Sequence, residues 1–242
     1  MQFEITQQYI QELQQLIAEQ KNDALLNLLK EVHYADIAEI IEDLETEESI
    51  YLIKLLESDV TSEVIAELDE DTREKVLKGL SSKEIAEEIS ELDTDDAADI
   101  ISELTNEQQE EVISHIEDLE HAKEIVELLR YHEDTAGGLM AKELVKVNEN
   151  WNVLTCVKEM RAQAEEVSRV HSIYVVDDND ILKGRLSLKD LLTTSTRSPI
   201  KDVFIKNVDS VNVNAEAGDV ARIMRKYDLE AIPVVDKNGV LV

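Results

Sequence analysis

The chain has 242 residues, of which 55 are Asp or Glu and 24 are Lys or Arg, so its formal net charge at pH 7 is −31. A hydrophobic content of 43% describes a folded globular protein, and the length leaves room for two domains. No apolar run reaches the roughly 18 residues of a membrane span, the N-terminus lacks a signal sequence, and the single cysteine excludes an intrachain disulfide framework. We therefore expect a soluble chain from a reducing compartment.

The acidic residues are concentrated in the first half of the chain. Residues 1–130 contain 37 acidic and 9 basic side chains, a net charge of −28, whereas residues 131–242 contain 18 and 15, a net charge of −3. A domain with such a field repels nucleic acid and attracts cations or a basic partner. We therefore exclude nucleic acid as a partner.

A 12-residue repeat begins at Lys30. The successive units are KEVHYADIAEII, EDLETEESIYLI, KLLESDVTSEVI, AELDEDTREKVL, KGLSSKEIAEEI, SELDTDDAADII and SELTNEQQEEVI, each with an aliphatic residue at its third position. This spacing predicts one short amphipathic helix per unit. Because two such helices cannot bury their apolar faces alone, pairs must stack. We predict that residues 1–130 form an acidic superhelical helix-pair (α-solenoid) domain.

Polar residues suited to capping these helices follow the recurring leucine. Ser81 and Glu84 also have the spacing of a capping box. We expect a helix to begin directly after each capping residue. The predicted capping residues are Thr46, Ser58, Asp69, Ser81, Asp93 and Thr105.

The stretch LDTDDAAD places four aspartates at the start of one predicted helix. Aspartates in the first turn interact favourably with the helix dipole, and this alone accounts for Asp93 and for Asp95. Asp95 and Asp99, however, lie on one face at i and i+4, where like charges cost about 0.2–0.5 kcal/mol. A Mg²⁺ ion would offset this repulsion, because it prefers carboxylate oxygens and retains several waters. A capped helix start and a magnesium site are both open interpretations.

Other metal and catalytic sites lack their motifs. The acidic stretch at Asp69 has no EF-hand glycine, and the five histidines have neither HxxxH spacing nor a cysteine partner for zinc. Cys156 lies at apolar helical spacing without a nearby histidine, and no glycine-rich phosphate loop follows a strand. We therefore predict that the chain is not an enzyme.

The pattern changes after the segment HEDTAGGLM. Gly137 and Gly138 permit positive φ angles and free rotation, which indicates a helix C-cap and a hinge at residues 131–138. Two β-α-β-β patterns follow, with IYVVDDND in the first matching IPVVDKNG in the second. This indicates a tandem duplication, with copies at 139–197 and 198–242, the second stopping inside its expected last strand pair.

These patterns resemble known families. IYVVD with LKGRLSLKDLL, and YDLEAIPVVD with NGVLV, resemble tandem CBS domains. The order of an acidic helical repeat, the connector YHEDTAGGLM and two CBS copies resembles the cytosolic portion of the MgtE family of magnesium channels and transporters. The resemblance implies an α + α/β fold, an α-solenoid followed by a CBS pair. It also implies a transmembrane domain in the same full-length chain, at the cytoplasmic face of the cell membrane.

The resemblance also implies Mg²⁺ ligands. In this family the DD..D helix contributes to magnesium sites that face the CBS pair, and a connector carbonyl and a CBS carboxylate add ligands. A plain turn residue is the alternative for the CBS carboxylate. The implied ligands are Asp95, Asp96, Asp99, Gly137 and Asp228.

A nucleotide site is implied by the segment GRLSLKD. Ser187 and Asp190 match the pattern with which CBS domains hold adenosine, the hydroxyl near a phosphate and the carboxylate on the ribose. The implied ligand is ATP or another adenine nucleotide. The alternative is that Asp190 only caps the helix that continues into LLTTS.

The resulting hypothesis is magnesium sensing. Mg²⁺ bridges carboxylates between the helical domain and the CBS pair, compacts a homodimer formed through the CBS domains, and closes the pore of the full-length protein. Two alternatives stay open: an adenine-nucleotide-sensing CBS module, and a solenoid scaffold that binds a basic protein.

Overall fold

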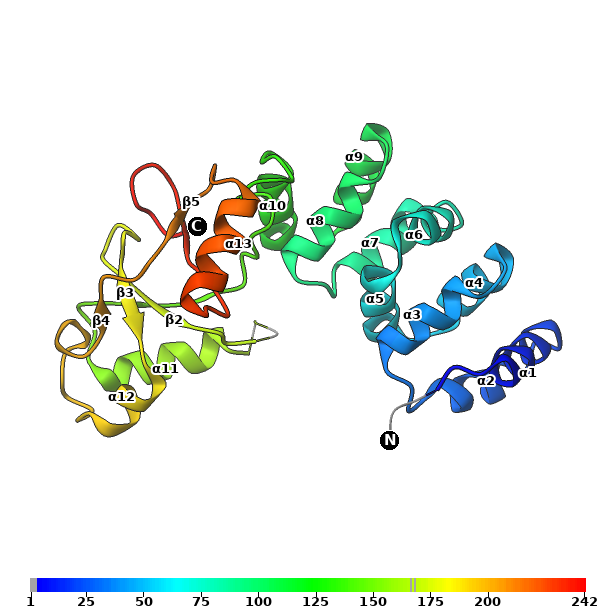
Figure 1. Cartoon of the computed structure of the whole chain (residues 1–242), viewed down its shortest axis with the longest axis horizontal. Coiled ribbons are helices and arrows are strands. Elements are labelled where there is room, and N and C mark those ends of the chain that lie inside the picture. The colour runs from blue at the N-terminus through cyan, green and yellow to red at the C-terminus, as the bar shows by residue number, and fades with distance from the viewer. Residues whose placement is uncertain (1–3, 166, 168) are drawn as a thin grey trace. The chain divides into compact units, whose positions relative to one another are not determined.

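The computed structural model describes residues 4–165, 167 and 169–242, and the chain forms two compact units (Figure 1). The first unit comprises the residues up to Leu92 together with Asp96–Lys123. The second unit comprises Asp93–Asp95 together with Glu124–Val242. Two boundaries between the units therefore fall inside helices, after Asp95 in the helix that begins at Thr94 and after Lys123 in the helix that begins at Leu119.

Short helices joined by tight turns occupy the first half of the chain. From Tyr34 to Asn106, each helix starts 12 residues after the preceding one, which confirms one helix per sequence repeat. The helices are α1 (Gln7–Ala18), α2 (Asn22–Leu29), α3 (Tyr34–Glu42), α4 (Thr46–Ile53), α5 (Ser58–Glu67), α6 (Glu70–Leu77), α7 (Ser82–Ile89), α8 (Thr94–Ser102), α9 (Asn106–His115) and α10 (Leu119–Leu128).

These helices pack on their second neighbours. Helix α5 contacts both α3 and α7, α7 also contacts α9, and α4 contacts α6. The aliphatic residues of the repeat are buried along these contacts, for example Ile41, Ile65 and Ile101, each at most 1% exposed. Stacking of helix pairs through such a stripe is the α-solenoid that the repeat predicts, and the predicted fold is confirmed.

Three of the predicted capping residues occupy the predicted positions. The side chains of Asp69, Ser81 and Thr105 accept N–H groups of α6, α7 and α9, and Ser81 forms the expected capping box with Glu84. The ammonium of Lys54 and the N–H of Ser81 lower the pKa of Glu84 to about 2. The start of α7 is therefore fixed by a carboxylate that stays ionised.

Two other predicted capping residues are wrong by one position. Helices α4 and α5 begin at Thr46 and Ser58 themselves, so that Glu45 and Glu57 are the N-cap residues. In α4 the reason is a capping box that starts one residue earlier, in which Glu48 Oε2 accepts the N–H of Glu45 at 3.2 Å.

The second unit contains two sheets with crossover helices. The first sheet has the order β1-β2-β3-β4, with β1 parallel to β2 and the other pairs antiparallel, and the second pairs β5 with β6 in parallel. The elements are β1 (Val145–Asn148), α11 (Val153–Gln163), β2 (Ile173–Val176), β3 (Leu182–Leu186), α12 (Leu188–Thr193), the 3₁₀ turn η1 (Ile200–Asp202), β4 (Ile205–Lys206), β5 (Val211–Asn212), α13 (Ala217–Tyr227) and β6 (Val234–Val235).

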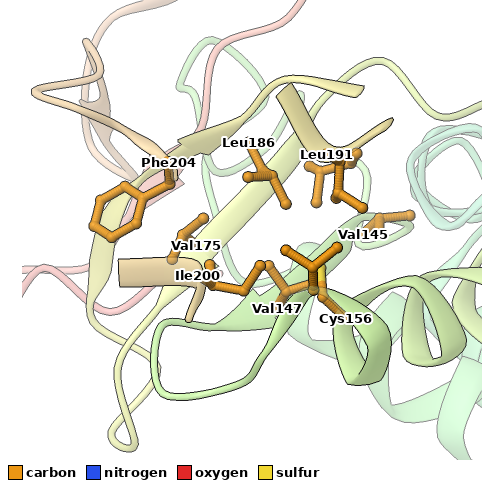
Figure 2. Close-up of a cluster of buried hydrophobic side chains, with 10 residues drawn as sticks. Val145, Val147, Cys156, Val175, Leu186, Leu191, Ile200 and Phe204 are labelled. Carbon is orange, nitrogen blue, oxygen red and sulfur yellow. The ribbon is translucent and has the colours of Figure 1, made fainter. Parts of the chain in front are cut away.

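A cluster of apolar side chains forms between the first sheet and α11 (Figure 2). Val145 and Val147 alternate with half-buried neighbours on β1, whereas β2 is buried at every position. Trp151 packs against this cluster and is the only tryptophan of the chain. The buried members are Val145, Val147, Val153, Cys156, Ile173, Val175, Leu186, Leu191, Ile200 and Phe204.

The turn after β2 and the turn after β6 are equivalent, which supports the tandem duplication. Asp177 Oδ1 accepts the N–H groups of the residues two and four positions later, and so does Asp236 Oδ1. Asp180 and Gly239, each three positions after these aspartates, both have left-handed φ angles, 57° and 83°. The strand β4 was not predicted, because its two residues have no detectable alternation.

Candidate functional site

Helix α8 carries the three aspartates predicted to bind Mg²⁺, Asp95, Asp96 and Asp99. Its core face is formed by Ala97, Ala98 and the following isoleucines, all 5% exposed or less. Asp96 and Asp99 are exposed and Asp95 is half-buried, so the carboxylates lie away from that core face. Hard oxygen donors in this arrangement fit the ligand preference of Mg²⁺.

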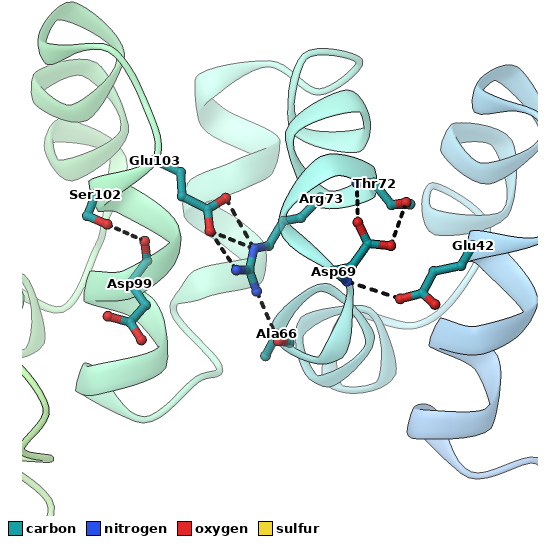
Figure 3. A network of polar contacts seen from close by, with 8 residues as sticks. All are labelled: Glu42, Ala66, Asp69, Thr72, Arg73, Asp99, Ser102 and Glu103. Atoms are coloured by element: carbon teal, nitrogen blue, oxygen red, sulfur yellow. Dashed lines mark hydrogen bonds and ion pairs between the residues drawn. The ribbon is translucent and has the colours of Figure 1, made fainter. Parts of the chain in front are cut away.

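The carboxyl end of α8 is fixed by a shielded ion pair in the first unit (Figure 3). Arg73 Nε donates to both carboxylate oxygens of Glu103, at 3.0 and 3.2 Å, and Arg73 Nη1 donates to the carbonyl oxygen of Ala66 at 3.0 Å. At the last turn of the helix, Ser102 Oγ donates to the Asp99 carbonyl oxygen at 2.7 Å. The end of the aspartate-bearing helix is therefore held by side chains of its own unit.

Similar polar bonds connect residues about one helix pair apart in the first unit. Their partners are 29 or 30 residues apart in sequence, as expected for a regular stack. These bonds are Lys54–Glu84, Ser58–Glu88, Arg73–Glu103 and Ser82–Glu111. Four glutamates of the acidic unit thus connect neighbouring helix pairs.

The connector is bonded to the second CBS copy. The N–H groups of Ala136 and Gly137 donate to the carbonyl oxygens of Ala215 and Val213, each at 2.8 Å, and the N–H of Ala217 donates to the Asp134 carbonyl oxygen. Gly137 is buried and belongs to the second unit. The connector therefore extends the backbone pairing at the end of β5.

Gly137 and Gly138 do not use the positive φ angles that glycine permits. Among the glycines that the structure describes, Gly239 is the one with a positive φ. Both connector glycines are instead required by close packing. A Cβ on Gly137 would lie 2.6 Å from Tyr131 Cδ1, and a Cβ on Gly138 would lie 2.4 Å from the His132 carbonyl oxygen.

Asp228 ends α13 in a left-handed conformation, with φ 52° and ψ 51°. It is exposed and lines a polar cavity of about 450 Å³ in the second unit. Arg185 from β3 and His171 line the same cavity, as do Asn207 and Asp209 after β4. Asn207 and Asp209 were not predicted as site residues from the sequence.

Ser187 and Asp190 lie at the start of α12. The Ser187 hydroxyl accepts the N–H of Asp190 at 3.5 Å and caps the helix, and the Asp190 side chain is half-buried. Neither residue is among those that line the polar cavity, whereas Arg185, two positions before Ser187, is. The structure thus places the predicted nucleotide residues next to this cavity along the chain rather than on its wall.

The one cysteine of the chain lies in the protein interior. Cys156 is fully buried, and burial raises the pKa of its thiol to about 11, so it is protonated at neutral pH. Among residues 4–165, 167 and 169–242, no three His, Cys, Asp or Glu side chains are grouped closely enough to hold a metal ion. Over the same residues, the structure has no helix with the length and hydropathy of a membrane span.

Family models match almost the whole chain. The model for the MgtE intracellular N domain matches residues 32–134, and the CBS domain model matches residues 136–196 and 200–242. Similar curated proteins include the magnesium transporter MgtE of Thermus thermophilus, 40% identical over 119 residues, and that of Enterococcus faecalis, 38% identical over 117 residues. These alignments cover 49% and 48% of this chain, and 26% of each transporter.

Two solved structures share the architecture over most of their length. A crystal structure of the cytosolic domain of the Mg²⁺ channel MgtE in complex with ATP aligns with a TM-score of 0.88 and 32% identity, over 96% of this chain and 95% of that chain. The soluble part of a magnesium transporter aligns with a TM-score of 0.81 and 27% identity, over 97% and 92%. The relatives that share the N domain and the CBS pair are named as magnesium transporters or channels. The chain therefore belongs to the MgtE family and corresponds to the part of it formed by the N domain and the CBS pair.

Proposed function

We propose that this chain is the magnesium-sensing regulatory region of an MgtE-type magnesium transporter or channel, at the cytoplasmic face of the cell membrane. The observation that carries the proposal is the alignment with the cytosolic domain of the Mg²⁺ channel MgtE over 95% of that domain. The transmembrane domain of the same full-length chain is the partner that this region regulates.

Mg²⁺ binds carboxylates of α8 and joins them to the CBS pair. Asp95, Asp96 and Asp99 supply oxygens on the side of α8 away from its core, and the Gly137 carbonyl and the Asp228 carboxylate supply oxygens in the second unit. Because Mg²⁺ keeps several waters, one or two carboxylates per ion are sufficient. All five are hard oxygen donors, the type that Mg²⁺ selects over softer ligands.

Mg²⁺ binding reduces the net negative charge of the helical domain. Residues 1–130 carry a net charge of −28, which resists close approach of further carboxylates within the screening length of about 8 Å at physiological ionic strength. Bound Mg²⁺ neutralises part of this charge, compacts a homodimer formed through the CBS domains and closes the pore. Shifting a population from 1:99 to 99:1 takes about 5.5 kcal/mol of differential binding, so several weak sites act together.

Small-angle scattering tests the magnesium response. The radius of gyration of the wild-type chain should fall between EDTA and about 10 mM Mg²⁺, a range that suits weak carboxylate sites. An Asp95→Asn/Asp99→Asn double variant should need at least about tenfold more Mg²⁺, which corresponds to about 1.4 kcal/mol. Glu107→Gln/Glu110→Gln, on the exposed surface of α9, removes the same charge and should leave the midpoint unchanged. Identical scattering of the wild type in EDTA and Mg²⁺ would contradict the proposal, and added NaCl separates binding from screening.

An adenine nucleotide is a second ligand, and a relative crystallised with ATP supports it. In this chain the polar cavity of about 450 Å³ offers the Arg185 guanidinium, a group suited to phosphate. Asp190 follows at the start of α12, where its carboxylate would meet the ribose hydroxyls. Because Asp209 and Asp228 also line the cavity, the triphosphate binds with its Mg²⁺ counterion.

Calorimetry with ATP tests this second ligand. Arg185→Ala and Asp190→Ala should each weaken ATP binding about tenfold, the loss of one charged hydrogen-bonding group, about 1.4 kcal/mol. Arg197→Ala, which removes an exposed arginine from the linker between the copies, should have no effect. Asp190→Ala should leave compaction by Mg²⁺ intact, so the two ligands are separable. Unchanged ATP affinity in both site variants would exclude this position.

A further inference from the structure

The first turn of α8 is held by a residue that lies 49 positions later in the sequence. Thr94 is fully buried, and its N–H donates to Glu143 Oε1 at 3.0 Å. Its hydroxyl donates to Glu143 Oε2 at 2.9 Å and accepts the N–H of Lys142 at 3.0 Å. All of these residues belong to the second unit.

A second bond anchors the segment that carries Glu143. Lys142 Nζ lies 2.9 Å from Glu127 Oε1, and the Lys142 side chain is only 10% exposed. Glu127 is in the last turn of α10, and the segment after Glu143 leads directly into β1. Glu143 therefore lies in the segment between α10 and β1, and from there its side chain binds the first turn of α8.

Glu143 acts as a helix cap for α8, although it is far from α8 in the sequence. The first amides of a helix lack partners within the helix, and an anion near them is favoured by the helix dipole. A carboxylate that accepts two hydrogen bonds from one buried residue forms stronger bonds than a neutral acceptor does. Leaving the buried Thr94 groups without that acceptor would be unfavourable.

We propose that Glu143 is a positioning residue that clamps the first turn of α8 to the CBS unit. The clamp fixes the orientation of Asp95, the next residue of the helix, relative to the CBS strands. Its effect on Mg²⁺ binding rests on the proposed function, whereas the clamp itself does not.

Hydrogen exchange of the full chain in EDTA tests the clamp without metal. Glu143→Gln should speed exchange of the α8 amides about tenfold, and Glu165→Gln, an exposed glutamate after α11, should not. Thr94→Ser keeps the hydroxyl and should behave as wild type, whereas the similarly shaped Thr94→Val should behave as Glu143→Gln. Wild-type exchange of α8 in Glu143→Gln, or equal exchange in the two Thr94 variants, would overturn the proposal.

The Mg²⁺ midpoint of compaction separates this inference from the proposed function. If both hold, Glu143→Gln should raise the midpoint at least about threefold and Thr94→Ser should leave it at the wild-type value, since a misaligned Asp95 binds less well. If the wild type does not respond to Mg²⁺ but the exchange result is as expected, the clamp is supported and magnesium sensing is not.

Discussion

Arg73→Met is expected to lower the free energy of unfolding of the helical unit by about 3 kcal/mol, because it leaves a shielded carboxylate without its partner. The Arg73 and Glu103 side chains are only 15% and 18% exposed. The substitution also removes the donor to the Ala66 carbonyl oxygen. Urea unfolding followed by far-ultraviolet circular dichroism measures the loss, because the helical unit supplies most of the helix. Trp151 fluorescence reports the second unit separately and should change little.

Two comparisons isolate the buried pair. Lys78→Met breaks an ion pair with Glu74 whose side chains are 67% and 57% exposed, and it should cost no more than about 0.5 kcal/mol. Arg73→Met/Glu103→Leu should recover much of the stability, since a buried pair replaced by apolar side chains is often neutral. A cost for Arg73→Met no greater than that for Lys78→Met would show that the pair is screened and the repeat is held by its apolar stripe alone.

The helical half could be predicted from the sequence because its structure is local and periodic. A 12-residue register fixes both where each helix begins and which side chains are buried, so α3 to α9 follow from the repeat. The errors at Thr46 and Ser58 arise where a glutamate, a poor capping residue by general preference, occupies the N-cap position. General preferences do not distinguish adjacent polar residues when either one can reach the same amides.

The candidate site was predictable only where its residues are close in sequence. Asp95, Asp96 and Asp99 fall on one helix because their spacing requires it. Glu143 was not predicted, since no local pattern shows that a carboxylate 49 positions later accepts hydrogen bonds from Thr94. The close packing at Gly137 was not predicted, because only the folded chain shows Tyr131 packed against it.

The two units differ in the kinds of contact that stabilise them. In the helical unit, charged side chains bridge successive repeats, so removing one partner of a shielded pair should be costly there. In the CBS unit, the strands pair closely and side chains fill the space between sheet and helix, so volume changes should dominate. The largest effect in the second unit is therefore expected where two strands approach most closely.

Gly184→Ala meets that condition. Gly184 is buried on β3 opposite Lys206 of β4, and an added Cβ would lie 2.1 Å from the Ile205 carbonyl oxygen and 2.7 Å from Phe204 Cδ2. Because the nearest atom belongs to the backbone, β3 and β4 must separate, and overpacking of this kind costs about 3 kcal/mol. Thermal unfolding followed by Trp151 fluorescence should show a decrease in Tm of about 10 °C.

Gly218→Ala provides the matched control, because it adds the same methyl group where nothing lies within 4 Å, in exposed helix α13. Alanine is the better helix former, so this variant should be more stable by about 0.5 kcal/mol. A separation of β3 from β4 would also displace Arg185, the residue after Gly184, and should weaken ATP binding in Gly184→Ala but not in Gly218→Ala. Equal Tm values for the two variants would mean that β4 moves away without cost, and that the pairing of β3 with β4 contributes little to the CBS unit.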